Sequence, residues 1–224
     1  MNIDFIILAA GKGTRMGGDS PKVLANLAGK PMIQHLINTI DSFPKSRTSI
    51  IVGHKAKDVE AGILSSKKIN FIHQKKQLGT AHAVKQALPF LKKNSISLIL
   101  YGDVPLVQKT TLKKLINSAA KGNLSLLTFI KDDPTGYGRI IRGSKSSVQK
   151  ITEHKDATNQ EKQIKEVNSG IMAVKSDLLQ KLLPAIKNQN AAKEYYLTDL
   201  VEIANTSSIK VGATICDAYE VGGA

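Results

Sequence analysis

Cysteine, long apolar runs and acidic residues are scarce in this sequence of 224 residues. The single cysteine, Cys216, excludes an intramolecular disulfide and any cluster of thiols that could bind zinc or an iron–sulfur cluster. The longest fully apolar run, Phe5 to Ala10, spans six residues, whereas a membrane-spanning helix needs about 20. The N-terminus also lacks the basic-then-apolar order of a signal peptide. We therefore expect a soluble cytoplasmic protein without a membrane partner.

Acidic residues are outnumbered by basic ones, 18 to 32, which gives a formal net charge of +14. Such an excess fits a polyanionic partner, an anionic small substrate or merely a lysine-rich surface. The lysines stand in short groups such as Lys67-Lys68 and Lys92-Lys93, and no long basic tract or aromatic-interleaved patch occurs. This distribution argues against nucleic acid as the partner. Binding to nucleic acid would in addition weaken steeply with salt.

What is present is a regular alternation of strand-like and helix-like segments. Short apolar runs predict buried strands, and apolar residues three or four positions apart predict helices between them. This alternation is typical of an α/β domain with a mostly parallel central sheet and helices on both faces. In the first half, the expected strands are Ile3–Ala10, Ser49–Val52, Ile69–Ile72 and Ile96–Tyr101, and the expected helices start at Pro31 or cover Ala81–Leu91 and Leu112–Ala119.

In the second half the strand-like runs lie closer together, which predicts a smaller mixed β extension. The polar stretch His154–Gln163 is expected to be a flexible loop. No repeat, linker or domain boundary is visible, so residues 1–224 are expected to form one domain. The expected strands here are Leu124–Ile130, Gly138–Ile141, Val148–Ile151 and Ile164–Val174, and the expected helices lie near Asp177–Lys187 and Leu197–Asn205.

A glycine-rich loop follows the first strand, in the motif Leu8-Ala9-Ala10-Gly11-Lys12-Gly13-Thr14-Arg15-Met16. Its two glycines allow a sharp turn and a close approach of main-chain N–H groups to an anion. The motif lacks the ending of a Walker loop, and Met16 replaces the third glycine of the dinucleotide fingerprint. Arg15 and Lys22 flank the loop at the sheet edge where open α/β folds bind ligands. A phosphate site is therefore favoured over an incidental glycine turn.

This motif, followed by Pro21-Lys22, resembles the signature of the sugar-1-phosphate nucleotidyltransferases. Five further blocks resemble one subfamily, the bacterial N-acetylglucosamine-1-phosphate uridyltransferases; they cover residues 77–83, 101–106, 132–140, 153–158 and 194–199. The resemblance implies a Rossmann-like nucleotidyltransferase domain. It also implies Mg²⁺-dependent transfer of UMP from UTP to N-acetylglucosamine-1-phosphate. The products would be pyrophosphate and UDP-N-acetylglucosamine, a precursor for peptidoglycan and lipopolysaccharide synthesis.

Nucleotidyl transfer depends on positioned phosphates and neutralised charge, because the attacking phosphate is already ionised near pH 7. Arg15 and Lys22 are the expected catalytic cations, since a planar guanidinium suits the leaving pyrophosphate and a mobile ammonium suits phosphate oxygens. Asp103 follows a buried run and a glycine at the same edge, where the resemblance makes it the Mg²⁺ ligand. An aspartate in that place also caps turns.

No nucleophile–base constellation is visible in the sequence. Cys216 is expected to be a small core residue in a late strand rather than a reactive thiol. The remaining candidates lack the spacing of a zinc site and are assigned no chemistry; they are His54, His73, His82 and His154.

The binding residues are carried over from the resemblance, position by position. The nucleotide is expected to contact Leu8, Ala9, Ala10, Gly11, Lys22, Gln74, Gly79, Thr80, Gly102 and Asp103. The sugar phosphate is expected to contact Tyr101, Gly138, Glu153, Asn168, Tyr196 and Thr198. A helix N-cap is the structural alternative for Thr80, and a solvated strand-edge charge is the alternative for Glu153.

The sequence ends before an asparagine that, in the family, adds a second contact to magnesium and nucleotide. It also ends before the left-handed β-helix that acetylates glucosamine-1-phosphate and forms a homotrimer in full-length members. We therefore expect a truncated chain without acetyltransfer, in which Mg²⁺ would rest on Asp103, phosphates and water; a monomer stays an open alternative. Two other functions stay open as well: a non-catalytic module that binds UTP or the UDP-sugar, and a nucleotidyltransferase for another sugar-1-phosphate.

Overall fold

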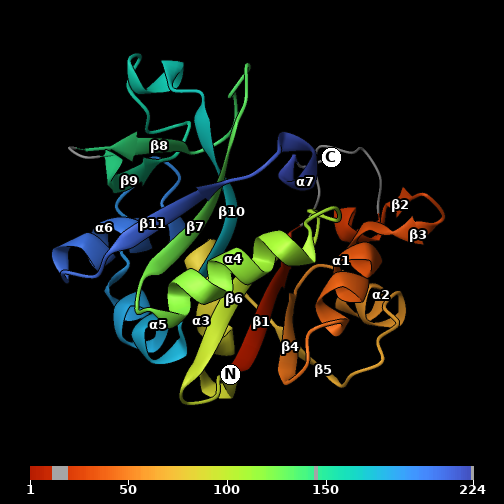
Figure 1. Ribbon diagram of the computed structural model, residues 1–224. Coiled ribbons are helices and arrows are strands. Elements are labelled where there is room, and N and C mark those ends of the chain that lie inside the picture. Colours follow the sequence, from red (N-terminus) through yellow and green to blue (C-terminus); the bar gives the residue numbers. More distant parts are fainter. Residues whose placement is uncertain (12–19, 144–145, 223–224) are drawn as a thin grey trace.

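The computed structural model describes residues 1–11, 20–143 and 146–222, and its centre is one twisted nine-stranded sheet (Figure 1). The strands follow the order β11-β7-β10-β6-β1-β4-β5, and β8 and β9 extend the sheet beside β10. β10 runs antiparallel to β6 and β7, whereas β6-β1-β4-β5 and β11-β7 pair in parallel. The strands are β1 (Asn2–Ala9), β4 (Ser46–Val52), β5 (Ile69–His73), β6 (Ser95–Tyr101), β7 (Leu124–Ile130), β8 (Arg139–Arg142), β9 (Val148–Thr152), β10 (Glu166–Lys175) and β11 (Val211–Ile215).

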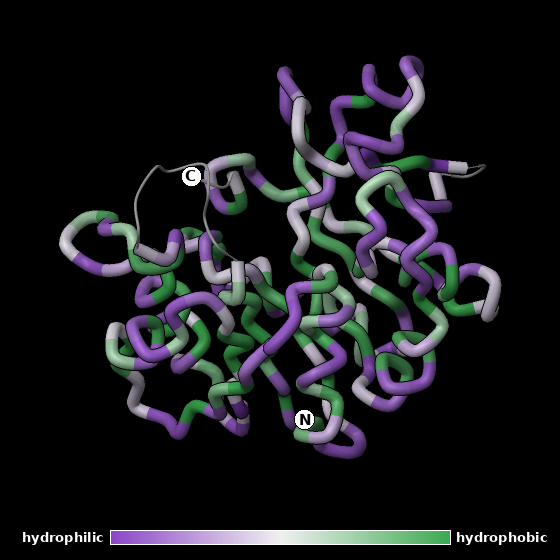
Figure 2. Tube along the Cα trace, turned by 180° about the vertical axis from the view of Figure 1, so that it is seen from behind, coloured by the Kyte–Doolittle hydropathy of each residue, from purple (hydrophilic) through white to green (hydrophobic). Residues whose placement is uncertain are grey.

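Helices cover both faces of the sheet, as the sequence predicts. The side chains of β1 alternate between two cores: Phe5 and Ile7 pack with α1, α2 and α4, while Ile6 and Leu8 pack with α3, α5 and α6. In Figure 2 the hydrophobic residues follow the central strands, and the hydrophilic ones gather on the loops. The helices are α1 (Met32–Asp41), α2 (Ala56–Ala61), α3 (Thr80–Ala87), α4 (Lys109–Ala120), α5 (Ser176–Leu182), α6 (Leu200–Thr206) and α7 (Ala218–Val221).

Shorter elements connect this framework. A two-stranded hairpin precedes α1, and single 3₁₀ turns follow α3 and α5 or precede α6. Among the described residues, no helix is long and apolar enough to cross a membrane. The short elements are η2 (Lys22–Leu24), β2 (Asn26–Leu27), β3 (Lys30–Pro31), η3 (Leu88–Phe90), η5 (Glu161–Gln163), η6 (Leu183–Ala185) and η7 (Leu197–Asp199).

The buried carboxylate of Asp4 connects neighbouring strands by hydrogen bonds at the end of the sheet opposite the glycine loop. Asp4 is 4% exposed, and its Oδ1 accepts hydrogen bonds from Nε and Nη2 of Arg47 at 2.8 and 2.6 Å. Its Oδ2 accepts from the main-chain N of Lys92 at 2.9 Å and from the Ser95 hydroxyl at 2.5 Å. One side chain on β1 thus joins β4, the segment before β6, and β6 itself.

Several boundaries differ from the predictions for local reasons. The helix predicted over Ala81–Leu91 ends at Ala87, because Pro89 falls in the next turn, which is 3₁₀. The stretch His154–Gln163 contains η5, and Glu161 bonds the main chain and hydroxyl of Thr158. This stretch is therefore a hydrogen-bonded turn rather than an open loop.

Candidate functional site

The carboxyl-terminal ends of β1 and β6 lie side by side at one edge of the sheet, and the residues at and after these ends line a pocket. The two strands pair in parallel with Leu8 opposite Tyr101, so both chains turn away at the same edge. The pocket between them has a volume of about 390 Å³, and we call it the glycine-loop pocket. Its lining residues are Leu8, Ala9, Ala10, Gly11, Lys22, Val23, Gln74, Gln77, Gly79, Thr80, Ala83, Tyr101, Asp103 and Glu194.

The predicted cation and the predicted carboxylate meet in this pocket. Lys22 Nζ lies 2.8 Å from Asp103 Oδ2, and the two side chains are 26% and 28% exposed. Lys22 is brought there by η2, whose 3₁₀ turn begins directly after Pro21, and Asp103 follows the end of β6. An ion pair that keeps this much solvent contact adds little to stability, so its charges remain available to a ligand.

Sequence reasoning missed Gln77, which fixes the start of the glycine loop. Its Nε2 donates a hydrogen bond to Ala10 O. A side-chain carbon at Gly53 would lie 2.9 Å from the same oxygen, so only glycine lets the loop after β4 come this close. The signal available in the sequence was the position of Gln77 at the head of a block that resembles the family.

The segment Leu78–Ala81 is held against Tyr195 by main-chain hydrogen bonds. Tyr195 N donates to Leu78 O at 2.8 Å, and Ala81 N donates to Tyr195 O at 2.9 Å. Between them Gly79 has φ +113°, and a side-chain carbon there would lie 2.6 Å from Tyr195 O. The N-cap of α3 is Gly79 rather than Thr80. Thr80 Oγ1 instead accepts from Leu197 N at 3.0 Å, which corrects the N-cap alternative.

A second pocket, with a volume of about 440 Å³, adjoins the first beneath the β extension, and we call it the extension pocket. Lys22, Tyr101 and Asp103 line both pockets. The two pockets therefore share the Lys22–Asp103 ion pair and the phenol ring of Tyr101. The other lining residues of the extension pocket are Val104, Thr135, Gly136, Tyr137, Gly138, Glu153, Asn168, Ser169, Gly170 and Val221.

A break in β10 shapes the wall of the extension pocket. The pairing of β10 with β7 shifts register between Asn168 and Met172. Asn168 Oδ1 accepts from Gly170 N at 3.0 Å, and Gly170 has φ +84°. A side-chain carbon at Gly170 would lie 2.5 Å from the Tyr101 ring. The bulge thus leaves room for Tyr101, whose pKa is raised by burial and by the charge of Glu153.

Glu153 is oriented by a neighbour from another element. Thr198 donates from its hydroxyl to Glu153 Oε1 at 3.0 Å. Burial raises the pKa of Glu153, with the charge of Asp156 adding to the shift. Burial also raises the pKa of Asp199 to about 6, with Glu202, Glu153 and Asp156 contributing. A group of carboxylates therefore lies close together at this side of the pocket.

Replacement of Asp199 by asparagine should stabilise the protein at neutral and alkaline pH. The pKa of this carboxyl rises from its ordinary value of 3.8 to about 6 in the folded state, so the folded protein binds the proton more tightly than the unfolded chain does. The contribution of the protonated carboxyl to the free energy of unfolding is therefore complete below about pH 4, and it is lost as the pH rises through 6. Thermal unfolding of Asp199→Asn and the original protein should show a higher Tm for the variant at pH 8 and equal values at pH 4. A Tm difference that does not change with pH would contradict this assignment.

The predicted site residues are placed as follows. Arg15 lies outside the described residues. Gly102 is buried and does not line the glycine-loop pocket, but its N–H donates to the main-chain oxygen of Leu8, which does, at 3.0 Å. Tyr196 and Thr198 do not line the extension pocket, but Thr198 reaches it through Glu153. All other predicted residues line one or both pockets.

Asp103 meets the requirements of a magnesium ligand. Its Oδ2 is held by Lys22, whereas no described residue donates to its Oδ1. Mg²⁺ is usually bound by one or two carboxylates together with substrate phosphates and water. One part-exposed carboxylate beside a phosphate-sized pocket fits that pattern.

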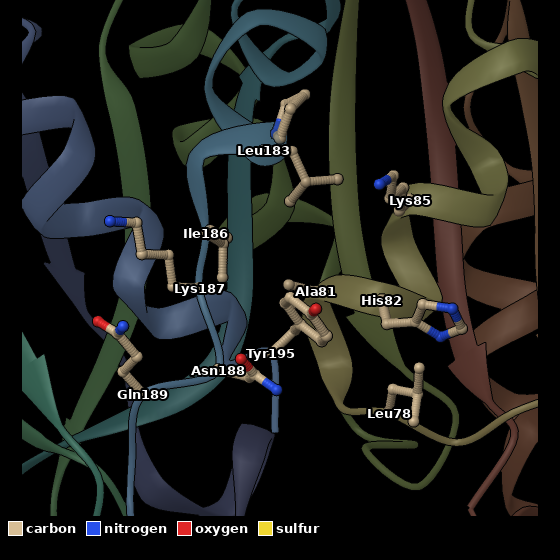
Figure 3. A pocket seen from close by; sticks show the side chains of 11 residues that line it. Leu78, Ala81, His82, Lys85, Leu183, Ile186, Lys187, Asn188, Gln189 and Tyr195 are labelled. Atoms are coloured by element: carbon tan, nitrogen blue, oxygen red, sulfur yellow. The ribbon is translucent and has the colours of Figure 1, made fainter. Parts of the chain in front are cut away.

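A third pocket, with a volume of about 400 Å³, adjoins the Leu78–Ala81 segment and is called the outer pocket (Figure 3). Ala81, Leu183, Ile186 and Tyr195 gather at its centre, and His82 and Lys85 project from α3.

Cys216 lies outside these three pockets, directly after β11. Burial, with the charges of Glu220 and Asp217, raises the pKa of its thiol to about 12, so the thiol stays protonated.

Solved structures confirm the fold. The chain overlays on UDP-glucose pyrophosphorylase complexed with UDP-glucose with a TM-score of 0.78, at 16% identity, over 96% of this chain and 90% of the other. A putative glucose-1-phosphate thymidylyltransferase from Bacillus anthracis gives a TM-score of 0.73, at 19% identity, over 97% and 90% of the two chains.

Sequence comparison finds much closer relatives. The bifunctional protein GlmU of Pseudomonas aeruginosa is 47% identical over 224 residues, which are 100% of this chain and 49% of the relative. GlmU of Cellvibrio japonicus is 46% identical over 209 residues, which are 93% and 46% of the two chains. The chain thus spans about half the length of the curated relatives that it matches.

The family model of the MobA-like NTP transferase domain matches residues 5–167. This range contains β1 from Phe5 onward, the glycine motif, Lys22, Asp103 and Glu153. The match covers most of the chain and agrees with the fold and with both pockets. The chain belongs to the MobA-like NTP transferase domain family and is a nucleotidyltransferase of α/β architecture.

Proposed function

We propose that the chain transfers UMP from UTP to N-acetylglucosamine-1-phosphate, with Mg²⁺ as cofactor. The observation that carries this proposal is the meeting of two pockets at Lys22, Tyr101 and Asp103. A reaction that joins two phosphorylated molecules needs two sites that open onto the same charged groups. The relatives support the choice of substrates, since the chain is 44–47% identical to proteins named GlmU.

In the proposed reaction a phosphate oxygen of the sugar phosphate forms a bond to the α-phosphorus of UTP. The bond from that phosphorus to the bridging oxygen breaks, and pyrophosphate leaves with the electron pair. The step therefore needs no proton transfer, and positioning and charge neutralisation supply the rate enhancement. Lys22 would contact phosphate oxygens where the pockets meet, and Arg15 would contact the departing pyrophosphate.

Asp103 would hold Mg²⁺ through its free carboxylate oxygen. When bound, the ion would neutralise phosphate charge and align the oxygens of the triphosphate. The glycine-loop pocket would take the nucleotide and the extension pocket the sugar. Glu153, oriented by Thr198, would accept from a sugar hydroxyl or amide. In this reading the protein acts in the cytoplasm, in the synthesis of cell-wall precursors.

A pyrophosphate-release assay tests the proposal. UTP, Mg²⁺ and each of a panel of sugar-1-phosphates should give release that is fastest with N-acetylglucosamine-1-phosphate. A faster rate with glucose-1-phosphate would assign a different sugar. Calorimetric binding of UTP without release under any condition would instead assign a non-catalytic binding module.

A further inference from the structure

Gln74 is a buried side chain at the base of the glycine-loop pocket, directly after β5. It is 6% exposed, and its main-chain N donates to Val52 O at 2.8 Å. Its side-chain Nε2 lies 2.9 Å from Nδ1 of His82 and 3.4 Å from the carbonyl oxygen of Gly79. The amide is therefore held between the end of β5 and the first turn of α3.

The carbonyl of Gly79 decides which end of the amide faces α3. A carbonyl oxygen can only accept a hydrogen bond. If the amide of Gln74 were turned over, two acceptor oxygens would face each other without a proton. Nε2 must therefore point to α3, with one N–H directed at Gly79 and the other at His82. No described residue donates to Gln74 Oε1, so this oxygen is left to accept from whatever enters the pocket.

This arrangement requires a particular state of His82. Two amide nitrogens approach the ring, Gln74 Nε2 at 2.9 Å from Nδ1 and Gln86 Nε2 at 3.4 Å from Nε2, and a neutral ring can accept at only one of its nitrogens. The shorter contact places the lone pair on Nδ1 and the proton on Nε2, and Gln86 donates to the main-chain oxygen of His82 at 3.1 Å instead. Burial lowers the pKa of His82, and the charge of Lys85 on the next turn adds to the shift. Burial and this charge both favour the neutral ring.

We propose that His82 is a positioning residue that holds the Gln74 carbonyl toward the nucleotide base and so selects a base with a ring N–H donor. Uracil carries such a donor at N3, whereas N3 of cytosine has only a lone pair and would meet the carbonyl oxygen unfavourably. The inference rests on the proposed function, because it concerns the base of the nucleoside triphosphate in the glycine-loop pocket. It assigns a role to a histidine that sequence reasoning left without one.

The test compares kcat/KM for UTP and for CTP in variants of His82. His82→Leu removes the acceptor and frees the amide to turn, so the preference for UTP over CTP should fall about tenfold, as expected for one lost hydrogen bond. His82→Asn places Oδ1 at the same number of bonds from the main chain as Nδ1, and it should restore most of the preference. His35→Leu is the matched control, because it makes the same substitution on α1, where Nε2 of the ring contacts the main-chain oxygen of Leu27 at 2.8 Å. Its preference should equal that of the original protein.

An unchanged UTP preference in His82→Leu, with normal UTP turnover in the original protein, would overturn the inference and leave the proposed function standing. If the original protein neither binds nor uses UTP, the proposed function itself fails. Should His82→Leu not fold, nitrogen-15 NMR of the unaltered protein gives the same decision. At pH 7.5 His82 should be neutral with the proton on Nε2, and a proton on Nδ1 would overturn the inference.

Discussion

Lys22→Met should lower the rate of pyrophosphate release by about 100- to 1,000-fold while the protein remains folded. The substitution removes a positive charge that is already in place where negative charge develops on the phosphates during the reaction. Loss of one such group typically lowers the rate by this amount. Folding should persist, because the pair with Asp103 is part-exposed and such pairs contribute about 0–1 kcal/mol. Turnover kinetics and circular dichroism on the same preparation separate the two effects. The methionine keeps most of the apolar stem, so the change removes mainly the charge.

Lys121→Met is the matched control, since this exposed lysine follows α4 at the other end of the helix from the pockets. It should show unchanged turnover. A double variant, Lys22→Met with Asp103→Asn, tests whether the two residues act as a unit, since coupled residues give losses that do not add. Near-normal turnover in Lys22→Met would contradict the assignment of Lys22 to the phosphates.

Asp4→Ala should lower the free energy of unfolding by about 3 kcal/mol, near the lower end of the range for breaking a buried ion pair. The substitution leaves the N–H of Lys92 without its acceptor and Arg47 without its partner, and it removes the link from β1 to β4 and β6. The side chain of Arg47 is 50% exposed, so water relieves part of this loss. Urea unfolding measures the change.

Asp132→Ala serves as the control for this experiment. Asp132 also forms an ion pair, with its Oδ1 at 2.9 Å from Lys165 Nζ, but its side chain is 97% exposed. Water replaces such a partner readily, so we expect no measurable change in stability. If Asp4→Ala and Asp132→Ala behave alike, the buried network does not stabilise the sheet.

Elements with strong apolar runs could be predicted from the sequence, and weaker ones could not. β1 contains five consecutive apolar residues, Phe5–Ala9, and β6 contains four, Leu98–Tyr101. Both strands were predicted within one residue of their bounds. A late strand was expected at Cys216 but without bounds, because Gly212 and Ala213 favour no strand; β11 ends at Ile215, one residue before Cys216. The six-residue α2 was missed, because only Ala56 and Val59 are buried and two residues define no helical period.

Within the candidate site, the residues that stand in recognisable blocks could be named in advance, and both pockets contain them. The roles of Gly170 and His82 could not be named in advance, because they arise from contacts between different elements of the fold. Gly170 is required by the ring of Tyr101, and His82 is defined by the amide of Gln74. Such pairs follow from how strands and helices pack, which local sequence does not determine.

The position of β10 between β6 and β7 has a consequence for synthesis on the ribosome. β1, β4, β5 and β6 can pair as soon as residue 101 emerges, but β7 has no neighbour until β10 follows about 40 residues later. Ribosomes add about 5–20 residues per second, so the edges of β6 and β7 stay unpaired for several seconds during synthesis. Unpaired strand edges are sites where other chains can pair. The extension pocket, whose wall is the bulge in β10, forms only when that gap in the sheet closes.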